Sequence, residues 1–266
     1  MKFEGYKVLI TGATSGIGLA AAEEFIAEGA TVIGIGRNFS KTETLGEKFI
    51  PFKCDVTEES QIQDAVRYAE KKYGMIDTLV CNAGAGILGT VENVEASQMD
   101  YAYKLLLRQA VLFTKYCVPL LRKSKNPSII HTASVASYMI GDAVPYNVLK
   151  AALLNYSRQS AAALLNANKT DASGKPRQVS DLEEGDNPYI RVNAICPGLI
   201  RTSIMDDKTW EILSAPEMLS DIPSRRIGEA WEPAKLISYL ASEKAKFITG
   251  AAVTIDGGWW TAHPRV

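Results

Sequence analysis

The stretch from Val8 to Arg37 constrains the fold most strongly, because it has the pattern of a strand, a glycine-rich turn, a helix and a second strand. Lys7 to Thr11 is a short run rich in β-branched residues and predicts the first strand. Apolar residues follow the turn at the spacing of one helix face: Ile17, Ala21 and Phe25. Gly29 suits the left-handed residue that ends a helix, and Thr31 to Ile35 predicts the second strand. The stretch is therefore expected to form a βαβ unit.

Three glycines, Gly12, Gly16 and Gly18, lie in the turn between the first strand and its helix. A diphosphate can approach the first turn of a helix only where no Cβ intrudes, and there free N–H groups and the helix dipole meet its charge. The spacing Gly-x-x-x-Gly-x-Gly differs from the common Gly-x-Gly-x-x-Gly fingerprint, and a glycine-rich turn also occurs in ordinary loops. The position between two predicted strands favours a dinucleotide-binding turn.

Chain length and charge narrow the classes of protein that fit. A chain of 266 residues with 47% hydrophobic and 22% charged residues can bury a large core as one α/β domain. The formal net charge of −1 gives no electrostatic footprint for nucleic acid and no basic face for a membrane surface. No apolar run reaches the roughly 18 residues that a membrane span needs. We therefore expect a soluble, cytoplasmic protein that acts on a small molecule.

The cysteines and histidines do not form the pattern of a metal site, and no metal is predicted. Four cysteines are scattered through apolar segments: Cys54, Cys81, Cys117 and Cys196. They contain no Cys-x-x-Cys pair and have no nearby histidine, so we interpret them as buried thiols. His131 lies in a predicted strand near the expected site and His263 lies near the end of the chain. Both are interpreted as structural.

Strands and helices alternate along the chain, which predicts a single α/β domain with a doubly wound parallel sheet, a Rossmann fold, flanked by helices on both faces. The seven predicted strands are Lys7–Thr11, Thr31–Ile35, Phe49–Cys54, Thr78–Cys81, Ser128–Thr132, Arg191–Ile195 and Ala252–Ile255. Further helices are expected from a cap at Thr57 to Tyr73, from about Ser97 to Arg122 and from Pro145 to about Asn166. Pro51 cannot donate to a central ladder, so the third strand is placed at an edge, as in the order 3-2-1-4-5-6.

Two irregular segments have different predicted roles. The segment Asn82 to Gly86 follows the fourth strand, and its two glycines allow the backbone to approach a ligand closely. The polar segment at about 167–189 is rich in Gly, Pro, Asp and Asn and predicts a surface insertion. The helix before it is expected to run away from the carboxyl edge of the sheet. The insertion therefore starts opposite the predicted site, which favours subunit contacts over catalysis.

Tyr146 and Lys150 are four residues apart, so both side chains are expected on one face of the same helix. A free tyrosine has a pKa of about 10, and a neighbouring cation favours its ionised form, which makes Tyr146 a candidate acid/base. The same spacing also occurs in amphipathic pairs on solvated helices. Here Ser134 ends the fifth predicted strand, at the edge where ligand-contacting residues of such sheets lie.

At these positions the chain resembles the short-chain dehydrogenase/reductase family, in its compact single-domain branch. The resemblance covers nearly the whole chain. It rests on Thr11-Gly12-Ala13-Thr14-Ser15-Gly16-Ile17-Gly18, Asp55-Val56, Asn82-Ala83-Gly84, Ser134, Tyr146 with Lys150, Pro197-Gly198 with Thr202, and Asp256-Gly257-Gly258. Membership would imply hydride transfer between a nicotinamide and an alcohol or carbonyl carbon.

The resemblance also implies roles for individual residues. Tyr146 would exchange the hydroxyl proton, Ser134 would hold the substrate oxygen, and Lys150 would bond the nicotinamide ribose and lower the pKa of Tyr146. The implied cofactor contacts are the turn residues Gly12, Thr14, Ser15, Gly16, Ile17 and Gly18, then Asp55 and Val56 at the adenine, Asn82, Ala83 and Gly84 on the adenosine side, Ile200 and Thr202 at the carboxamide, and Pro197 and Gly198 just before them.

The residues after the second strand bear on the choice of cofactor. A carboxylate there would bond the ribose of NAD, whereas an arginine would pair with the 2′-phosphate of NADP. The sequence has Gly36, Arg37 and Asn38 and no acid at the strand end. NADP(H) is therefore favoured, with Arg37 and Asn38 at the phosphate, and NAD(H) is the alternative, in which Arg37 is a solvated turn residue.

Leu106 departs from the family pattern. Family members usually carry an asparagine in the middle of the helix after the fourth strand, and alignment through Asp100 and Thr114 places Leu106 there. In the family this residue's main chain holds a water that passes protons to the lysine. Leucine keeps the carbonyl but lacks the amide that steadies the local bend. The chain is expected to oxidise a secondary alcohol or reduce a ketone, with a catalytically impaired nucleotide-binding sensor or scaffold as the alternative.

The segment at about 203–224 lies where the family carries a mobile substrate lid. Its apolar residues are Trp210, Ile212, Leu213, Met218 and Leu219. Together with Tyr138 to Ile140 and Trp259-Trp260, they favour an apolar pocket, although core or interface packing is the alternative. Arg201 and Arg225 are candidates for binding an acidic group or for solvent-facing charge.

Assembly is a further expectation from the resemblance. Family members are commonly tetramers in which the long helices after the fourth and fifth strands pair across a two-fold axis. A homotetramer, or a homodimer with the same pairing, is therefore expected.

Overall fold

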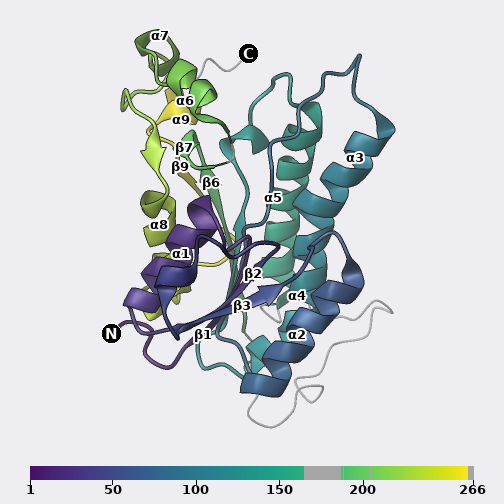
Figure 1. Cartoon of the computed structure of the whole chain (residues 1–266), viewed down its shortest axis with the longest axis vertical. Coiled ribbons are helices and arrows are strands. Elements are labelled where there is room, and N and C mark those ends of the chain that lie inside the picture. Colours follow the sequence, from purple (N-terminus) through teal and green to yellow (C-terminus); the bar gives the residue numbers. More distant parts are fainter. Residues whose placement is uncertain (165–186, 188, 204, 263–266) are drawn as a thin grey trace.

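A seven-stranded parallel sheet forms the centre of the protein (Figure 1). This computed structural model describes residues 1–164, 187, 189–203 and 205–262. The sheet strands are β1 Lys7–Thr11, β2 Thr31–Gly36, β3 Phe49–Lys53, β4 Thr78–Cys81, β5 Ser128–Thr132, β6 Arg191–Pro197 and β9 Ala252–Ile255. Their order is β3-β2-β1-β4-β5-β6-β9, and every neighbouring pair is parallel. The predicted single-domain, doubly wound sheet is confirmed.

Helices cover both faces of this sheet (Figure 1). The covering helices are α1 Gly16–Ala27, α2 Glu59–Tyr73, α4 Gln109–Arg122, α5 Val144–Leu164 and α8 Trp231–Ala241. Helices α1 and α8 pack together on one face, and α2, α4 and α5 cover the other. Successive strand residues point to opposite faces, so in β1 Val8 and Ile10 join the α1–α8 core while Leu9 joins the opposite core. Burial on both faces explains why the strands are continuously apolar.

Two local predictions, Pro51 in an edge strand and Gly29 at a helix end, are confirmed. Pro51 lies in β3, which is an edge strand, so its missing N–H is not needed by a second neighbour. Gly29 has a φ of 103° directly after α1, and Gly74 has a φ of 71° at the end of α2. Both are left-handed residues that end their helices.

The prediction of one continuous helix from about Ser97 to Arg122 is wrong. The structure divides this stretch into α3 (Ala96–Ala102), a π-helical segment (Tyr103–Arg108) and α4. A π-helical turn keeps helical dihedrals but shifts the hydrogen bonds to i→i+5, which apolar periodicity does not reveal. Arg108 fixes the end of this segment, because its guanidinium donates to Thr57 O (3.1 Å) and to Glu59 Oε2 (2.8 Å).

Smaller differences concern the ends of elements. Thr57 does not cap α2, which begins after Glu58; instead the Thr57 hydroxyl donates to Asp55 Oδ1 (2.8 Å). Strand β2 extends one residue beyond the prediction, β3 ends one residue earlier and β6 continues through Pro197. Helix α5 starts one residue earlier than predicted. Its expected end at Asn166 and nearly all of the predicted insertion at 167–189 lie outside the described residues.

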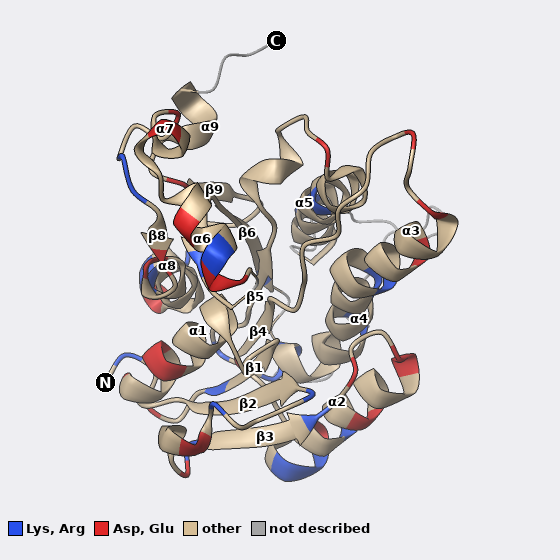
Figure 2. Cartoon of the chain, turned by 45° about the horizontal axis from the view of Figure 1, so that its top comes forward, with Lys and Arg blue, Asp and Glu red and all other residues tan. Residues whose placement is uncertain are grey.

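Short elements gather over the carboxyl edge of the sheet, the edge that comes forward in Figure 2. They are β7 Ile200–Arg201, α6 Asp207–Leu213, α7 Pro216–Leu219, β8 Gly228–Glu229 and α9 Trp259–Ala262. The 3-10 turn Val135–Ser137 follows β5 at the same edge, and two further 3-10 turns are Glu43–Leu45 and Glu243–Ala245. Strands β7 and β8 pair with each other outside the main sheet. None of the helices in the described part of the chain is long and apolar enough to cross a membrane.

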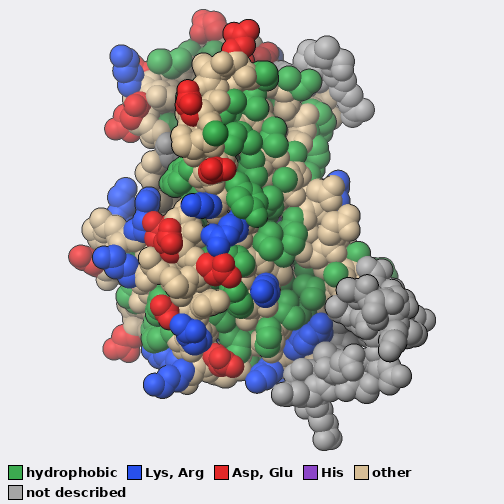
Figure 3. Space-filling view, turned by 90° about the vertical axis from the view of Figure 1, so that its right-hand side faces the viewer, with side chains coloured by type: hydrophobic (Ala, Val, Ile, Leu, Met, Phe, Trp, Pro, Cys, Tyr) green, Lys and Arg blue, Asp and Glu red, His purple; other side chains and the backbone are tan. Residues whose placement is uncertain are grey.

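One side of the molecule carries a band of hydrophobic side chains (Figure 3). Tyr101 of α3, Tyr103 of the π-helical segment and Val148 of α5 are exposed large hydrophobic residues. Single exposed apolar residues are ordinary on a protein surface, but neighbouring ones mark a candidate contact surface. We call these three residues the α3–α5 patch.

Arg191, at the start of β6, holds the end of α8 in place. Its side chain is 5% exposed, and its two terminal nitrogens donate to backbone carbonyls. The acceptors are Leu240 O (2.7 Å), Ala241 O (3.3 Å), Ser242 O (3.4 Å), Ala245 O (3.0 Å) and Ile248 O (3.4 Å). The last carbonyls of a helix lack intrahelical donors and carry partial negative charge, so one buried cation satisfies several of them.

We predict that Arg191→Met lowers the free energy of unfolding by about 3 kcal/mol or more, because buried carbonyls lose charged donors. Urea unfolding followed by tryptophan emission measures this loss. Arg67→Met is the matched control, since Arg67 is an exposed arginine paired with Asp64 and should change stability by less than about 1 kcal/mol. Equal effects of the two variants would contradict the role given to Arg191.

Candidate functional site

A cavity of about 650 Å³ opens at the carboxyl edge of the sheet. Its walls come from the turn between β1 and α1, the segment after β4, the end of β5, the start of α5 and the segment after β6. Strands β1 and β4 are neighbours whose connections leave toward opposite sides of the sheet. This is the switch point at which doubly wound sheets bind ligands.

The glycine turn packs too closely for side chains. A Cβ on Gly18 would lie 2.2 Å from Gly12 O, and a Cβ on Gly12 would lie 2.9 Å from Ala83 Cα. Gly16 has a φ of 52° and starts α1. Ser15 precedes the helix, and its side chain makes no capping hydrogen bond. The N-terminus of α1 therefore faces the cavity without a side-chain cap, which fits the diphosphate of a dinucleotide.

The ends of β1 and β4 are tied together by Thr11. Its Oγ1 accepts hydrogen bonds from Asn82 N (2.9 Å) and Ala83 N (3.0 Å), and Asn82 Nδ2 donates to Thr11 O (3.3 Å). These contacts fix the Asn82-Ala83-Gly84 segment, whose three residues line the cavity. Thr11 was part of the predicted first strand and had no predicted role of its own. The signal that could have indicated one is a hydroxyl at the carboxyl end of a strand, beside a second ligand-binding segment.

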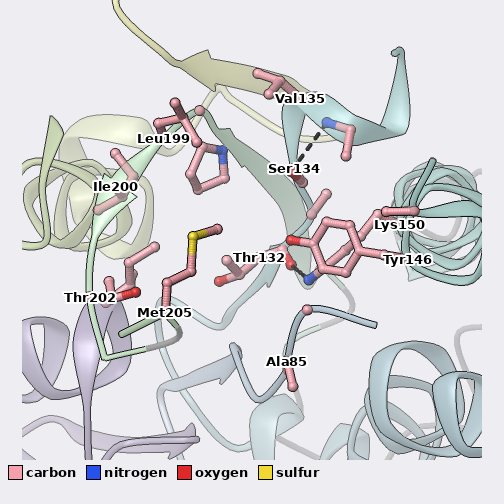
Figure 4. Close-up of a pocket in the computed structure, with 18 of the residues that line it drawn as sticks. Ala85, Thr132, Ser134, Val135, Tyr146, Lys150, Leu199, Ile200, Thr202 and Met205 are labelled. Carbon is pink, nitrogen blue, oxygen red and sulfur yellow. Dashed lines mark hydrogen bonds between the residues drawn. The ribbon is translucent and has the colours of Figure 1, made fainter. Parts of the chain in front are cut away.

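Ser134 and Tyr146 meet on one wall of the cavity (Figure 4). Ser134 follows β5 in an extended conformation, and its Oγ accepts from Ala136 N (3.1 Å) at the start of a 3-10 turn. Tyr146 lies in the first turn of α5. Burial raises the pKa of Tyr146, and a hydrogen bond with the Ser134 side chain offsets part of that rise. The phenol is therefore protonated at neutral pH.

Lys150 lies one helical turn after Tyr146 and is 3% exposed. Its Nζ donates to Thr132 O (2.6 Å) and lies 5.6 Å from the centre of the Tyr146 ring. Burial lowers the pKa of Lys150 to about 8. The net shift of the Tyr146 pKa is upward, because removal of the phenol from water outweighs its hydrogen bond with Ser134; the lowering expected from Lys150 stays a prediction. Thr132, whose carbonyl orients Lys150, was not singled out from the sequence.

Leu106 lies within the π-helical segment and is fully buried. A Cβ on Gly84 would lie 3.2 Å from Leu106 Cδ2 and 3.7 Å from Lys150 Nζ. Leu106 and the lysine head group therefore both approach Gly84. The helix is irregular at this position although the chain carries leucine there, so an asparagine amide is not required for the departure from α-helical geometry.

Most of the predicted site residues are brought together around this one cavity. Those that line it are Gly12, Ser15, Gly16, Ile17, Asn82, Ala83, Gly84, Ser134, Tyr146, Lys150, Pro197, Gly198, Ile200 and Thr202. Thr14, Gly18, Arg37, Asn38, Asp55 and Val56 are not among its lining residues. Gly18 is buried beneath the turn, and Thr14 packs against Gly36.

The other four outlying residues follow β2 and β3, at the same edge of the sheet. Arg37 and Asn38 are exposed, and Asn38 Oδ1 accepts from Ser40 N (2.9 Å). The pKa of Asp55 is lowered chiefly by its hydrogen bond from the Thr57 backbone, and the charge of Arg37 adds to the effect. Arg37 and Asp55 are thus close enough to act on the same end of an extended ligand.

The wall opposite Tyr146 includes Ile200, Thr202 and Met205 (Figure 4). Trp210 of α6 lines the cavity and is 3% exposed, and its indole N–H donates to Thr202 O (2.8 Å). The segment predicted to be a lid therefore contributes three cavity residues, Ser203, Met205 and Trp210. Ile87 and Leu88 also line the cavity but were not predicted, because they follow the Asn82–Gly86 segment without any periodic pattern.

The remaining titratable groups are structural in character. All four cysteines are free and buried, as predicted. In the part of the chain that the structure describes, no three His, Cys, Asp or Glu side chains gather as metal ligands would. His131 is fully buried, does not line the cavity, and has its Nε2 3.4 Å from Thr114 Oγ1. Burial lowers the pKa of His131 to about 3, so the ring is neutral at physiological pH.

Comparisons with known proteins agree with this geometry. Residues 6–169 match a family profile described as short chain dehydrogenase, and residues 184–260 match one described as enoyl-(acyl carrier protein) reductase. The chain belongs to the short-chain dehydrogenase/reductase family. A relative named 3-oxoacyl-(acyl-carrier-protein) reductase FabG, from Thermotoga maritima, is 33% identical over 97% of this chain and 99% of its own length.

Solved structures of short-chain dehydrogenases/reductases have the same fold. The structure of levodione reductase has a TM-score of 0.83 at 26% identity and covers 98% of this chain and 100% of its own. A 3-ketoacyl-(acyl-carrier-protein) reductase from Brucella melitensis complexed with NADH has a TM-score of 0.81 at 26% identity, covering 97% of this chain and 99% of its own. The chain is thus an oxidoreductase of a nicotinamide-dependent family, and a non-enzymatic sensor or scaffold is not favoured.

The buried state of His131 generates a prediction about acid stability. Between pH 3 and 6.5 the unfolded chain binds a proton at this residue that the folded chain does not, so stability falls as pH falls through that window. The contribution is about 1.4 kcal/mol per pH unit below 6.5. A His131→Gln variant has no histidine to protonate at this position, so its stability lacks this loss at low pH. The difference in unfolding free energy between the unchanged protein and the variant should therefore shrink on acidification. Urea titrations at pH 7.5 and 5 measure it, and parallel pH profiles would contradict it.

Proposed function

We propose that this protein transfers a hydride between NADP(H) and a secondary alcohol or ketone. The observation that carries the proposal is the convergence of Ser134, Tyr146 and Lys150 on one cavity beside an uncapped helix N-terminus. A proton donor, a hydrogen-bonding hydroxyl and a cation within one cavity are the groups that carbonyl reduction requires. The bound nicotinamide nucleotide supplies or accepts the hydride.

Each of the three side chains has a distinct proposed task. Tyr146 donates the proton to the carbonyl oxygen in reduction, because burial keeps its phenol protonated. Ser134 donates a hydrogen bond that holds the same oxygen. Lys150 is held by Thr132 O so that its ammonium binds the ribose and favours the phenolate that forms as Tyr146 loses its proton. In alcohol oxidation the proton moves the opposite way.

The first test concerns Tyr146. We expect Tyr146→Phe to lower turnover about 10²- to 10⁴-fold, because the proton donor is lost while the ring remains. Tryptophan quenching should give an NADPH dissociation constant close to that of the unchanged protein. Tyr138→Phe is the matched control, since the Tyr138 hydroxyl lies 3.7 Å from Cys196 Sγ and the residue does not line the cavity. Unchanged turnover of Tyr146→Phe would remove the assignment.

The preference for NADP(H) is proposed from the end of β2. Arg37 is exposed directly after this strand, and no carboxylate occupies positions 36 to 38. A guanidinium there can make charge-assisted hydrogen bonds with a 2′-phosphate, which NAD(H) lacks. Asp55 lies near Arg37, but its carboxylate already accepts two hydrogen bonds from Thr57. The Arg37 guanidinium therefore remains available to a phosphate.

We expect Arg37→Ala to raise the dissociation constant for NADPH about tenfold or more, because a charged hydrogen-bond partner of the phosphate is lost. The dissociation constant for NADH should change little. Fluorescence titrations of both nucleotides at one fixed salt concentration measure the two effects, with Arg67→Ala as a surface-charge control. An equal change for NADPH and NADH would contradict the placement of the phosphate at Arg37.

We also propose a homotetramer, or a homodimer, that uses the α3–α5 patch. Tyr101, Tyr103 and Val148 are exposed on the side where hydrophobic side chains gather in Figure 3. Burying such residues between subunits removes apolar area from water. Sedimentation equilibrium should show the oligomer, and Tyr103→Glu should shift it toward smaller species, whereas Glu95→Gln, at an exposed polar residue directly before α3, should not. A purely monomeric protein at micromolar concentration would contradict this assembly.

A further inference from the structure

Large apolar side chains make up part of the cavity lining. We call six of them, Leu88, Met139, Ile140, Met205, Trp210 and Trp259, the apolar end of the cavity. They come from the segment after β4, the loop before α5, the predicted lid and the start of α9. Tyr138 and Trp260, the chain neighbours of Met139 and Trp259, stack with ring centres 5.1 Å apart and so connect two of the segments that form this lining. A substrate body in this region would exchange water for hydrophobic side chains.

Charged groups are scarce in the same lining. Of the described residues that line the cavity, Lys150 and Asp142 are the two that carry a charge. Lys150 is buried, donates to Thr132 O and lies beside Tyr146, not among the six apolar residues. A carboxylate or phosphate at the apolar end would therefore meet no described cation.

Arg201 and Arg225, the candidates from the sequence for an acidic group, do not supply that cation. The Arg201 guanidinium lies 5.7 Å from the centre of the Trp210 ring and donates to Ser214 Oγ (3.1 Å). Arg225 donates to Ser220 O (2.7 Å). Neither residue lines the cavity. Of the two alternatives given for these arginines, the structure favours charges that lie outside the pocket.

A carboxylate, Asp142, lies beside the apolar side chains at the mouth of the cavity. Gly89 pairs with the loop before α5, with Gly89 N donating to Asp142 O (3.3 Å) and Val144 N donating to Gly89 O (2.8 Å). This pairing places the exposed Asp142 beside Ile140, which is 91% exposed, and near Leu88, which is 75% exposed. A substrate entering here passes apolar side chains and one carboxylate.

Charge around the mouth is mixed. The segment 203–224 contains five carboxylates and one lysine, and Arg225 and Arg226 follow it directly. Figure 2 shows acidic segments on α6 and α7 and on the loops before α3 and α5, and basic segments on α6 and after α7. Of these charges, Asp142 is the one that lines the cavity, so it is the carboxylate that an entering anion meets, and its repulsion weakens with salt.

We infer that the substrate is a neutral carbonyl compound with a bulky apolar body, and that carboxylates and phosphate-bearing acyl thioesters are disfavoured. This inference rests on the proposed function, because it assigns the apolar end of the cavity to the substrate of that reaction. Burial of the apolar body against Met139, Met205 and Trp259 provides binding. An anionic group would be desolvated there without a partner and would face Asp142.

A matched pair of ketones tests the inference: methyl 7-oxooctanoate and 7-oxooctanoate, which share the reacting methyl ketone and differ in the distal charge. At low salt the ester should be reduced with a kcat/KM about tenfold or more above that of the acid. Asp142→Asn should narrow this ratio. Asp221→Asn should leave it unchanged, because Asp221 is an exposed acid of the predicted lid segment that does not line the cavity.

Binding measurements separate failure of this inference from failure of the proposed function. NADPH binding is measured first, and its absence would contradict the proposed function itself. The two ketones are then titrated into the NADP⁺ complex, with emission of Trp210 and Trp259 as the readout. Tighter binding of the ester supports the inference. With NADPH binding intact, equal or tighter binding of the acid, or binding of neither ketone, overturns it.

Discussion

Close packing of the β1–α1 turn against the end of β4 is the constraint on which the site depends. Gly18 must lack a side chain because Gly12 O occupies the space of its Cβ, and Thr11 Oγ1 binds two backbone N–H groups after β4. The uncapped first turn of α1 and the Asn82–Gly84 segment are therefore held at the same cavity. Bulkier residues in the turn would push these two ligand-binding segments apart, and the cavity would then lose the geometry on which the other site residues depend.

Burial then determines the protonation states in the site. Lys150 and Tyr146 both leave water at the start of α5, which lowers the pKa of the lysine and raises that of the tyrosine. The lysine is compensated by Thr132 O at 2.6 Å, and the tyrosine by its hydrogen bond with Ser134. A protonated phenol held beside a hydroxyl is prepared to give up a proton to a carbonyl oxygen. The fold thus places a protonated Tyr146 where it can donate to a carbonyl oxygen bound in the cavity.

Much of this arrangement could be predicted from the sequence, and the misses have physical causes. Strand runs and left-handed glycines predicted most of the elements and their ends, and Pro51 placed the third strand at an edge, because each has a local conformational preference. The π-helical segment was missed, since its residues have ordinary helix propensities and differ only in hydrogen-bond register. The net pKa of Tyr146 was also missed. The four-residue spacing in the sequence shows that Lys150 is near Tyr146. It does not show how far the phenol is removed from water, because that depends on burial by segments distant in the sequence.

The most direct test of the central proposal follows the hydride itself. NADPH carrying deuterium at both C4 positions is incubated with the protein and a neutral methyl ketone, and the product alcohol is examined by mass spectrometry. Direct transfer in the cavity beside Tyr146 predicts one deuterium on the carbinol carbon for each NADPH oxidised. A carbinol without deuterium, or bound NADPH that is never oxidised by ketones of any size, would contradict the proposed function.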